Sequence, residues 1–147
     1  MIDAAISTYG TSILELLRLC VCGDHSKVLA ELQQYDDDPD RLLSGIVQQD
    51  ELVGAAGLWR PYPDQAILLH IAIKPQYQRQ GLGTKLIDHL MRHYNIPILE
   101  AETDIAAVDF YRRLGFQITS LGEKYPGVER FRCLLNGRVM LGNDIVR

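Results

Sequence analysis

Apolar residues along this chain recur with two periods, one typical of helices and one typical of strands. In the N-terminal part, helical spacing predicts a helix over Ser12–Cys20 that Gly23 ends. Ile2–Ile6 has room for a short edge strand, and a second helix follows with Asp24 or Ser26 as its N-cap. The apolar positions that set these periods are Ile13, Leu14, Leu17 and Val21, then Val28, Leu29, Leu32 and Tyr35.

The next segment predicts strands. Leu42–Gln48 and Leu52–Trp59 are apolar runs joined by a tight turn, and Arg60–Asp64 is a proline-stiffened loop. Ala66–Ile73 is almost wholly apolar, as expected of a strand buried on both faces. Three adjacent strands in this order predict an antiparallel meander.

Helices and strands then alternate. An apolar stripe predicts a helix from Leu82 that stops at Asn95, followed by a short strand over Pro97–Ala101 with a parallel neighbour. Asp104 can cap a further helix, which Gly115 ends in the left-handed conformation.

Two more strands complete the chain. Phe116–Leu121 and Glu129–Leu135 form a predicted hairpin, whereas the tail from about Asn136 is left unassigned. The element order indicates one α+β domain over residues 1–147 with a mixed sheet.

Charge and cysteine content exclude several classes of function. The chain has 147 residues with 15 Lys and Arg against 19 Asp and Glu, and this acidic balance disfavours nucleic acid as a partner. Three cysteines (Cys20, Cys22 and Cys133) fit neither a disulfide framework nor a zinc site. The N-terminus lacks the plan of a signal peptide, and no early apolar stretch is long enough to span a bilayer. We therefore expect a reduced, cytoplasmic protein without a membrane partner.

Two patterns have the spacing of metal ligands but lack other residues that a metal site requires. The acidic loop Asp36–Asp40 lacks the glycine and glutamate that an EF-hand calcium loop requires. His89 and His93 lie one helical turn apart, but no glutamate follows His89 and no third ligand is near. No metal is expected.

A loop with two closely spaced glycines joins the apolar strand to the following helix. Gly81 and Gly83 stand at the predicted helix start, preceded by Gln78. A helix N-terminus leaves backbone N–H groups without partners and carries partial positive charge, and glycine lets a phosphate approach the backbone. The loop is therefore predicted to bind an anion through the N–H groups of residues 79–84.

Two segments resemble the GNAT N-acetyltransferase superfamily. Ile73–Gly83 is similar to its acetyl-coenzyme A motif, Q/R-x-x-G-x-G/A, and Ala107–Phe116 resembles its later helix, A-x-x-F-Y-x-x-x-G-F. The two motifs occur in the family's order and at a usual distance. The resemblance implies a twisted, mostly antiparallel mixed sheet that is splayed at its two central strands, with helices on both faces.

The resemblance also implies how acetyl-coenzyme A is held. The strand end offers backbone groups to the pantetheine arm, and the glycine loop holds the pyrophosphate. At Asp104 the family often has an asparagine that contacts the coenzyme arm, and an ionised carboxylate cannot donate that hydrogen bond. The implied coenzyme-binding residues are Ile71, Ala72, Ile73, Gln78, Arg79, Gln80, Gly81, Leu82, Gly83, Thr84, Asp104 and Tyr111.

The implied reaction is direct attack of a neutral amine on the thioester, without a covalent enzyme intermediate. Tyr111 matches the family's tyrosine that gives a proton to the leaving sulfur, although its place on an apolar stripe also suits a core aromatic. His70 and Glu102 are the candidate bases, Glu100 is also near the expected wedge, and a water chain is an alternative.

Three questions stay open at this stage. The acceptor is a primary amine of a small molecule, a peptide or a protein, and a homodimer is neither required nor excluded. A non-catalytic acyl-coenzyme A sensor on the same fold is the alternative function, because no base is obvious. A dinucleotide-binding protein is disfavoured, because the loop lacks the full G-x-G-x-x-G pattern and its helix does not open a βαβ unit.

Overall fold

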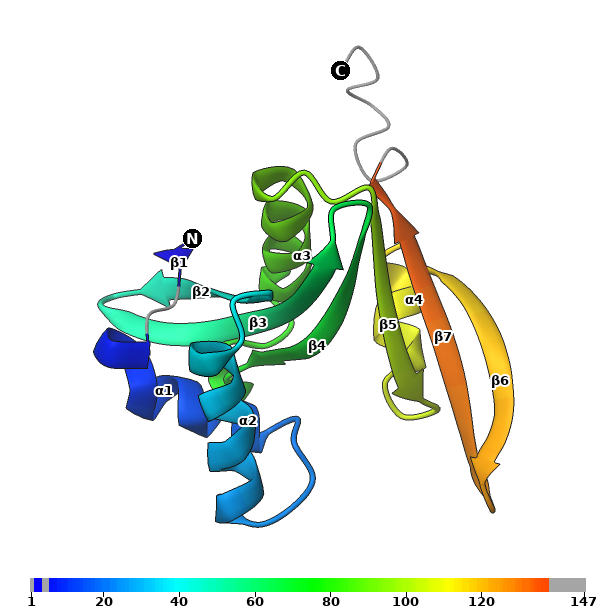
Figure 1. Ribbon diagram of the computed structural model, residues 1–147, viewed down its shortest axis with the longest axis horizontal. Helices are drawn as coiled ribbons and strands as arrows, with labels where there is room; N and C mark the ends of the chain where they lie inside the picture. Colours follow the sequence, from blue (N-terminus) through cyan, green and yellow to red (C-terminus); the bar gives the residue numbers. More distant parts are fainter. Residues whose placement is uncertain (1, 4–5, 138–147) are drawn as a thin grey trace.

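A computed structural model describes residues 2–3 and 6–137 of the chain (Figure 1). These residues form a seven-stranded sheet with helices packed against it. The helices are α1 (Ile6–Arg18), α2 (His25–Asp37), the 3-10 helix η1 (Pro75–Tyr77), α3 (Leu82–His93) and α4 (Val108–Arg113). The strands are β1 (Ile2–Asp3), β2 (Arg41–Gln48), β3 (Glu51–Tyr62), β4 (Gln65–Ile73), β5 (Ile98–Asp104), β6 (Gln117–Tyr125) and β7 (Val128–Asn136).

The strand order across the sheet is β1-β2-β3-β4-β5-β7-β6. β4 and β5 pair in parallel, and the other neighbouring strands pair in antiparallel fashion. The parallel pair follows from the connection, because a parallel neighbour needs a crossover and α3 supplies it. The mixed, mostly antiparallel sheet predicted from the sequence is confirmed.

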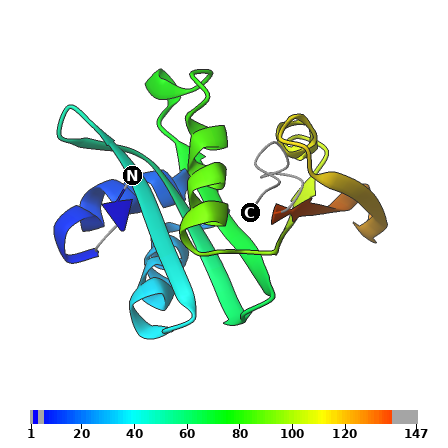
Figure 2. The same ribbon diagram turned by 90° about the horizontal axis from the view of Figure 1, so that it is seen from above.

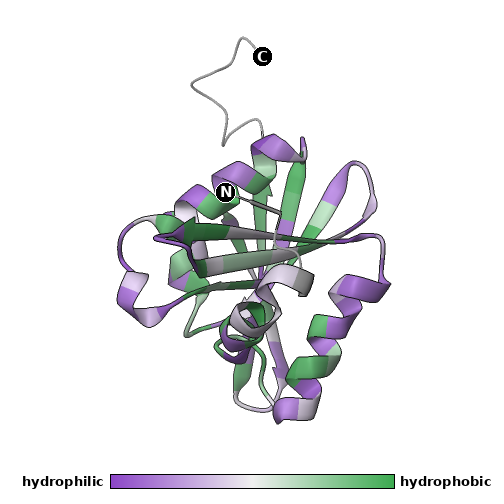
Figure 3. Cartoon of the chain, turned by 90° about the vertical axis from the view of Figure 1, so that its left-hand side faces the viewer, coloured by the Kyte–Doolittle hydropathy of each residue, from purple (hydrophilic) through white to green (hydrophobic). Residues whose placement is uncertain are grey.

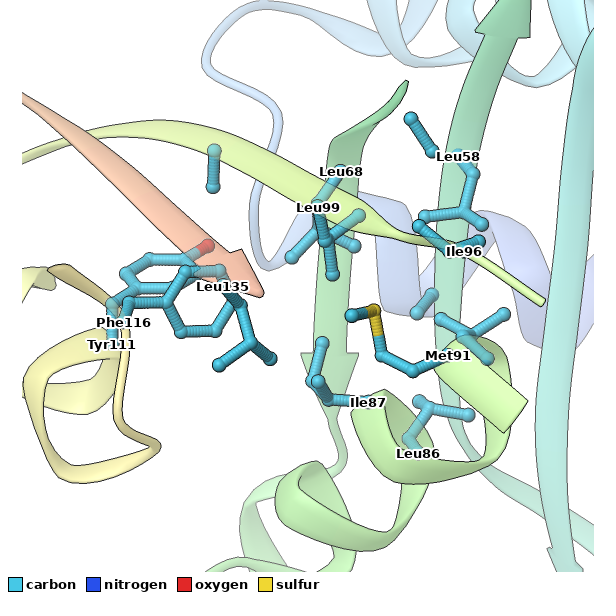
Figure 4. Packing of buried hydrophobic residues seen from close by; sticks show 14 of the residues in the cluster. Leu58, Leu68, Leu86, Ile87, Met91, Ile96, Leu99, Tyr111, Phe116 and Leu135 are labelled. Atoms are coloured by element: carbon cyan, nitrogen blue, oxygen red, sulfur yellow. The ribbon is translucent and has the colours of Figure 1, made fainter. Parts of the chain in front are cut away.

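Two hydrophobic clusters hold the helices against the sheet. Ile13 and Leu16 of α1 and Val28 of α2 pack with Leu52 and Ala55 of β3. The larger cluster joins α3 and α4 to the central strands, where Ile87 and Met91 face the strands and Tyr111 lies beside Phe116 (Figure 4). Hydrophilic residues prevail on the outer helices and turns, and hydrophobic residues on the central strands (Figure 3). This is the arrangement expected of helices on both faces of one sheet.

Three features differ from the sequence prediction. α1 begins at Ile6 rather than Ser12. Of the predicted loop Arg60–Asp64 only Pro63 and Asp64 form a turn, because β3 continues to Tyr62, which pairs with Gln65. β4 is not buried on both faces: Ala66, Leu68 and Ala72 are buried, but the other six residues of the strand are only half-buried. The reason is that β5 leaves the side of β4 soon after the two strands meet.

The C-terminal part of β7 closes back on the start of β5. Gly137 donates a backbone hydrogen bond to the carbonyl oxygen of Pro97 at 2.7 Å. The remainder of the unassigned tail, residues 138–147, lies outside the described residues.

Candidate functional site

The two central strands open into a wedge. β4 and β5 pair only at Ala66 with Leu99 and at Ile67 with Glu100. Beyond these pairs β4 stays with β3 as far as Ile73, while β5 stays with β7, and the β5-β7-β6 half turns away from the β1–β4 half (Figure 2). The splayed sheet implied by the resemblance is therefore present.

The edge of β4 that faces the wedge carries backbone groups without a strand partner. Lys74 donates its backbone N–H to Val53 of β3 at 2.8 Å. Because backbone groups of successive residues alternate in direction along a strand, those of Ile73 and Ile71 point to the opposite side, toward the wedge. Gln78 reaches back and donates from Nε2 to the carbonyl oxygen of Ile73 at 2.9 Å. Gln78 thus fastens the glycine loop to the strand end.

The glycine loop opens directly onto the start of α3. Arg79 and Gly81 both have positive φ, 64° and 76°, and Gly81 is the N-cap of α3 without a side-chain cap. A Cβ on Gly81 would meet nothing within 4 Å, so the backbone is open to an approaching group. Gln80, Gly81 and Thr84 are exposed, whereas the side chain of Leu82 is buried in the core. This uncapped helix start fits an anion such as a pyrophosphate.

Gly83 has a second role that its motif does not indicate. A Cβ at this position would lie 3.0 Å from Cε1 of Phe110 on α4. The ring of Phe110 therefore packs on the first turn of α3, and the next residue of α4 is Tyr111. Gly83 thus sets the distance between the start of α3 and α4, which carries the tyrosine.

Replacing Gly83 by valine is expected to push Phe110 away and to cost about 1–3 kcal/mol of unfolding free energy, as overpacking does. Urea unfolding measures this loss. The double variant Gly83→Val, Phe110→Ala is expected to lose less than the two single changes together, because alanine removes the obstacle. Strict additivity of the two losses would show that the contact does not matter.

Tyr111 projects from α4 into the cluster beside the wedge. Its ring lies 5.1 Å from that of Phe110 and 5.2 Å from that of Phe116, both edge to face. The residue is 8% exposed, and within the described residues no hydrogen bond engages its hydroxyl. Burial, with smaller contributions from Cys133 and Cys20, raises the pKa of Tyr111 to about 12. The hydroxyl therefore carries its proton at neutral pH.

Asp104 holds the turn that leads into α4. Its Oδ1 accepts hydrogen bonds from the backbone N–H groups of Ala106 at 3.0 Å and Ala107 at 3.2 Å. The helix itself begins at Val108, so Asp104 caps the preceding turn and not α4. One carboxylate oxygen is thereby committed to the backbone.

His70 faces α2. Its Nδ1 lies 2.6 Å from the hydroxyl of Tyr35, and its Nε2 lies 3.6 Å from Oε2 of Glu31. The Tyr35 hydroxyl occupies the place that a Cβ on Gly57 would need. Both ring nitrogens therefore contact side chains of α2, and His70 joins that helix to the sheet.

The pKa of His70 is lowered, chiefly because burial disfavours the imidazolium and also because Arg41 is near; Glu31 opposes the shift. Below the ordinary value of about 6.5 the unfolded chain then binds more protons than the folded chain. The unfolding free energy is expected to fall as pH decreases through this range. Urea unfolding at several pH values, compared with the same series for His70→Asn, measures the effect, and identical slopes would contradict it.

The two glutamates of β5 differ in how they are held. Glu102 contacts Lys124 through Oε1 at 2.9 Å and Arg130 through Oε2 at 3.2 Å, so both oxygens are occupied. These hydrogen bonds lower the pKa of Glu102, and the one from Lys124 has the largest effect. Oε1 of Glu100 accepts a hydrogen bond from Nε2 of Gln65 at 2.8 Å and forms an ion pair with Arg132 at 3.3 Å. Within the described part of the chain, Oε2 of Glu100 has no protein partner.

Residues 11–116 match the model of the Acetyltransferase (GNAT) family. The chain belongs to this family. A ribosomal protein bS18-alanine N-acetyltransferase of Escherichia coli is 32% identical over 92 residues, which cover 58% of this chain and 62% of the E. coli enzyme. The chloroplastic GCN5-related N-acetyltransferase 2 of Arabidopsis thaliana is 32% identical over 74% of this chain and 46% of its own length. The chain thus matches less than two thirds of the length of these relatives.

Solved structures share the GNAT fold of this chain. An aminoglycoside 6'-N-acetyltransferase complexed with coenzyme A superimposes with a TM-score of 0.78 at 19% identity, covering 92% of this chain and 95% of that one. The E. coli ribosomal-protein-S18-alanine N-acetyltransferase gives 0.72 at 20% identity, covering 91% and 90%. These likenesses confirm the fold that the motifs implied.

The sequence also led to expectations about metal ions, membranes, cellular location and oligomeric state. Among residues 2–3 and 6–137, no three His, Cys, Asp or Glu side chains gather as a metal ion would need. No helix in that part of the chain is both long and apolar enough to cross a membrane. The cytoplasmic location stays a prediction, and the homodimer stays open.

Proposed function

We propose that this chain transfers an acetyl group from acetyl-coenzyme A directly to a primary amine. The observation that carries the proposal is the continuous path from the free edge of β4 at Ile71 and Ile73 to the uncapped start of α3. An extended arm fits a free strand edge, and a pyrophosphate fits a helix N-terminus. The open space at Gly81 supports the fit, because a Cβ there would meet nothing within 4 Å.

In the proposed reaction the amine nitrogen bonds to the thioester carbon, the carbon–sulfur bond breaks, and the sulfur leaves with the bonding electrons. The protein has to polarise the carbonyl oxygen, protonate the sulfur and remove the amine proton. The backbone N–H of Ile73 can polarise the carbonyl oxygen. Tyr111 is assigned the proton transfer to the leaving sulfur, because its hydroxyl keeps its proton and makes no hydrogen bond within the described residues.

We assign removal of the amine proton to Glu100. Of the three candidates near the wedge, His70 contacts side chains of α2 with both of its ring nitrogens. Glu102 contacts Lys124 and Arg130 with its two carboxylate oxygens. Glu100 alone among them keeps one oxygen without a partner in the part of the chain that the structure describes, while Gln65 and Arg132 hold the other oxygen. It also stands at the last β4–β5 pair, where the wedge begins.

The surface around Glu100 favours an acceptor with one amine on an apolar body. Cross-strand pairing places Trp59, Ile67, Glu100 and Leu134 in one row on the same sheet face. Trp59 is exposed, and the other three are half-buried. The ion pairs of Arg130, Arg132 and Lys124 neutralise the nearby carboxylates, so this face offers little to a polycation. A peptide or protein N-terminus fits better than a polyamine, in line with the relative that acts on a ribosomal protein alanine.

Two measurements test the assignment. Calorimetry with coenzyme A is expected to show binding, and a thiol-trapping assay with acetyl-coenzyme A and short peptides of differing first residue is expected to show release of free coenzyme A. Binding without release from any peptide or small amine would support the acyl-coenzyme A sensor instead. No binding at millimolar coenzyme A would refute both.

A further inference from the structure

A small hollow lies between α1 and the sheet, against the segment of β4 that borders the wedge. Its volume is about 10 Å³, close to what a single water needs. Leu16 and Leu17 of α1, with Cys20 in the turn that follows the helix, line one side. Ala55 of β3 and His70 and Ala72 of β4 line the other. Most of this lining is apolar, so the hollow suits a methyl group.

The hollow adjoins the backbone that is proposed to hold the thioester. His70 and Ala72 flank Ile71, whose backbone groups point into the wedge. The Ile71 N–H lowers the pKa of the Cys20 thiol in part, and Cys20 contributes to the raised pKa of Tyr111. Cys20 therefore connects the hollow with the reaction centre.

We propose that this hollow is the acyl pocket and that Cys20, with Leu16 behind it, limits the transferred group to acetyl. The inference rests on the proposed acetyl transfer and adds its chain-length selectivity. A methyl matches the available volume, whereas each further methylene has to displace Cys20 or Leu16. Leu16 is 1% exposed and cannot yield cheaply, because close-packed cores resist added volume.

Cys20 acts here by its bulk. Burial raises the pKa of its thiol to about 11, although the Ile71 N–H lowers it in part. The thiol is therefore protonated at neutral pH, and a protonated thiol is a poor nucleophile. This agrees with direct transfer to the amine, without an acyl-cysteine.

Calorimetry with free coenzyme A and with its acetyl, propionyl and butyryl thioesters tests the pocket without an acceptor. In the unmodified chain, propionyl-coenzyme A is expected to bind at least about 10-fold more weakly than acetyl-coenzyme A, the range in which pockets discriminate one methylene. Cys20→Ala is expected to bring the two within about 3-fold, as the freed volume admits the methylene. Cys20→Met is expected to weaken acetyl-coenzyme A while free coenzyme A is unaffected.

Cys22→Ala is the matched control, because Cys22 lies two residues farther along the same connection between α1 and α2 but does not line the hollow. It is expected to keep the selectivity of the unmodified chain. Equal affinity for the acetyl, propionyl and butyryl thioesters, or a selectivity that Cys20→Ala leaves unchanged, would overturn the acyl pocket while coenzyme binding stands. Loss of binding to free coenzyme A itself would instead reject the proposed function.

Discussion

Replacing Tyr111 with phenylalanine is expected to slow acetyl transfer by about 10²- to 10⁴-fold, the usual contribution of a positioned acid. The leaving thiolate must gain a proton, and the Tyr111 hydroxyl is protonated, buried beside the wedge and free of other hydrogen bonds in the described residues. The ring stays in place through its contacts with Phe110 and Phe116, so phenylalanine should fold normally. Steady-state rates with saturating acetyl-coenzyme A measure the loss.

Coenzyme affinity separates a catalytic role from a packing role. If Tyr111 acts as the acid, calorimetry should find coenzyme A bound with nearly unchanged affinity in the phenylalanine variant. Tyr9→Phe is a suitable control, because Tyr9 belongs to the other hydrophobic cluster and its loss should leave the rate alone. A full rate in Tyr111→Phe would show that the sulfur receives its proton from elsewhere, for example from water.

Local sequence signals predicted the elements around the wedge well. The proposed anion site depends on neighbouring residues only, since Gly81 supplies the left-handed N-cap and α3 begins at the next residue. The end of α4 was equally readable, because Gly115 adopts a φ of 93° that glycine tolerates best. Such features are set within a few residues and need no tertiary contact.

Features that depend on distant segments were not predictable in the same way. The half-buried state of β4 depends on where β5 diverges, which no residue of β4 encodes. His70 was one of several candidate bases, and a paired histidine on the sheet face was the alternative; its partner Tyr35 comes from a helix and lies 35 residues earlier in the chain. The one clue was Gly57, a glycine inside a strand, which marks a close approach by another group.

The choice among carboxylates likewise needed the hairpin of β6 and β7. Glu100 and Glu102 are two residues apart on one strand and share a sheet face, so the sequence offers no reason to separate them. Their partners differ because Lys124 and Arg130 lie at the far end of the hairpin, and Arg132 lies nearer the wedge. Lys124 and Arg130 therefore bind both carboxylate oxygens of Glu102.

This asymmetry leads to a second large expected effect: Glu100→Gln should lower the rate of acetyl transfer near neutral pH by about 10²- to 10⁴-fold, whereas Glu102→Gln should change it little. Glutamine keeps the shape of Glu100 but cannot take a proton from the amine. As the pH rises toward the pKa of the amine substrate, more of the acceptor is already neutral, so the Glu100→Gln variant should recover progressively. Rate profiles of both variants from pH 7 to 10 measure this recovery. Equal losses in the two variants, or a loss in Glu100→Gln that does not depend on pH, would point to a binding role for the carboxylate or to a water chain as the base.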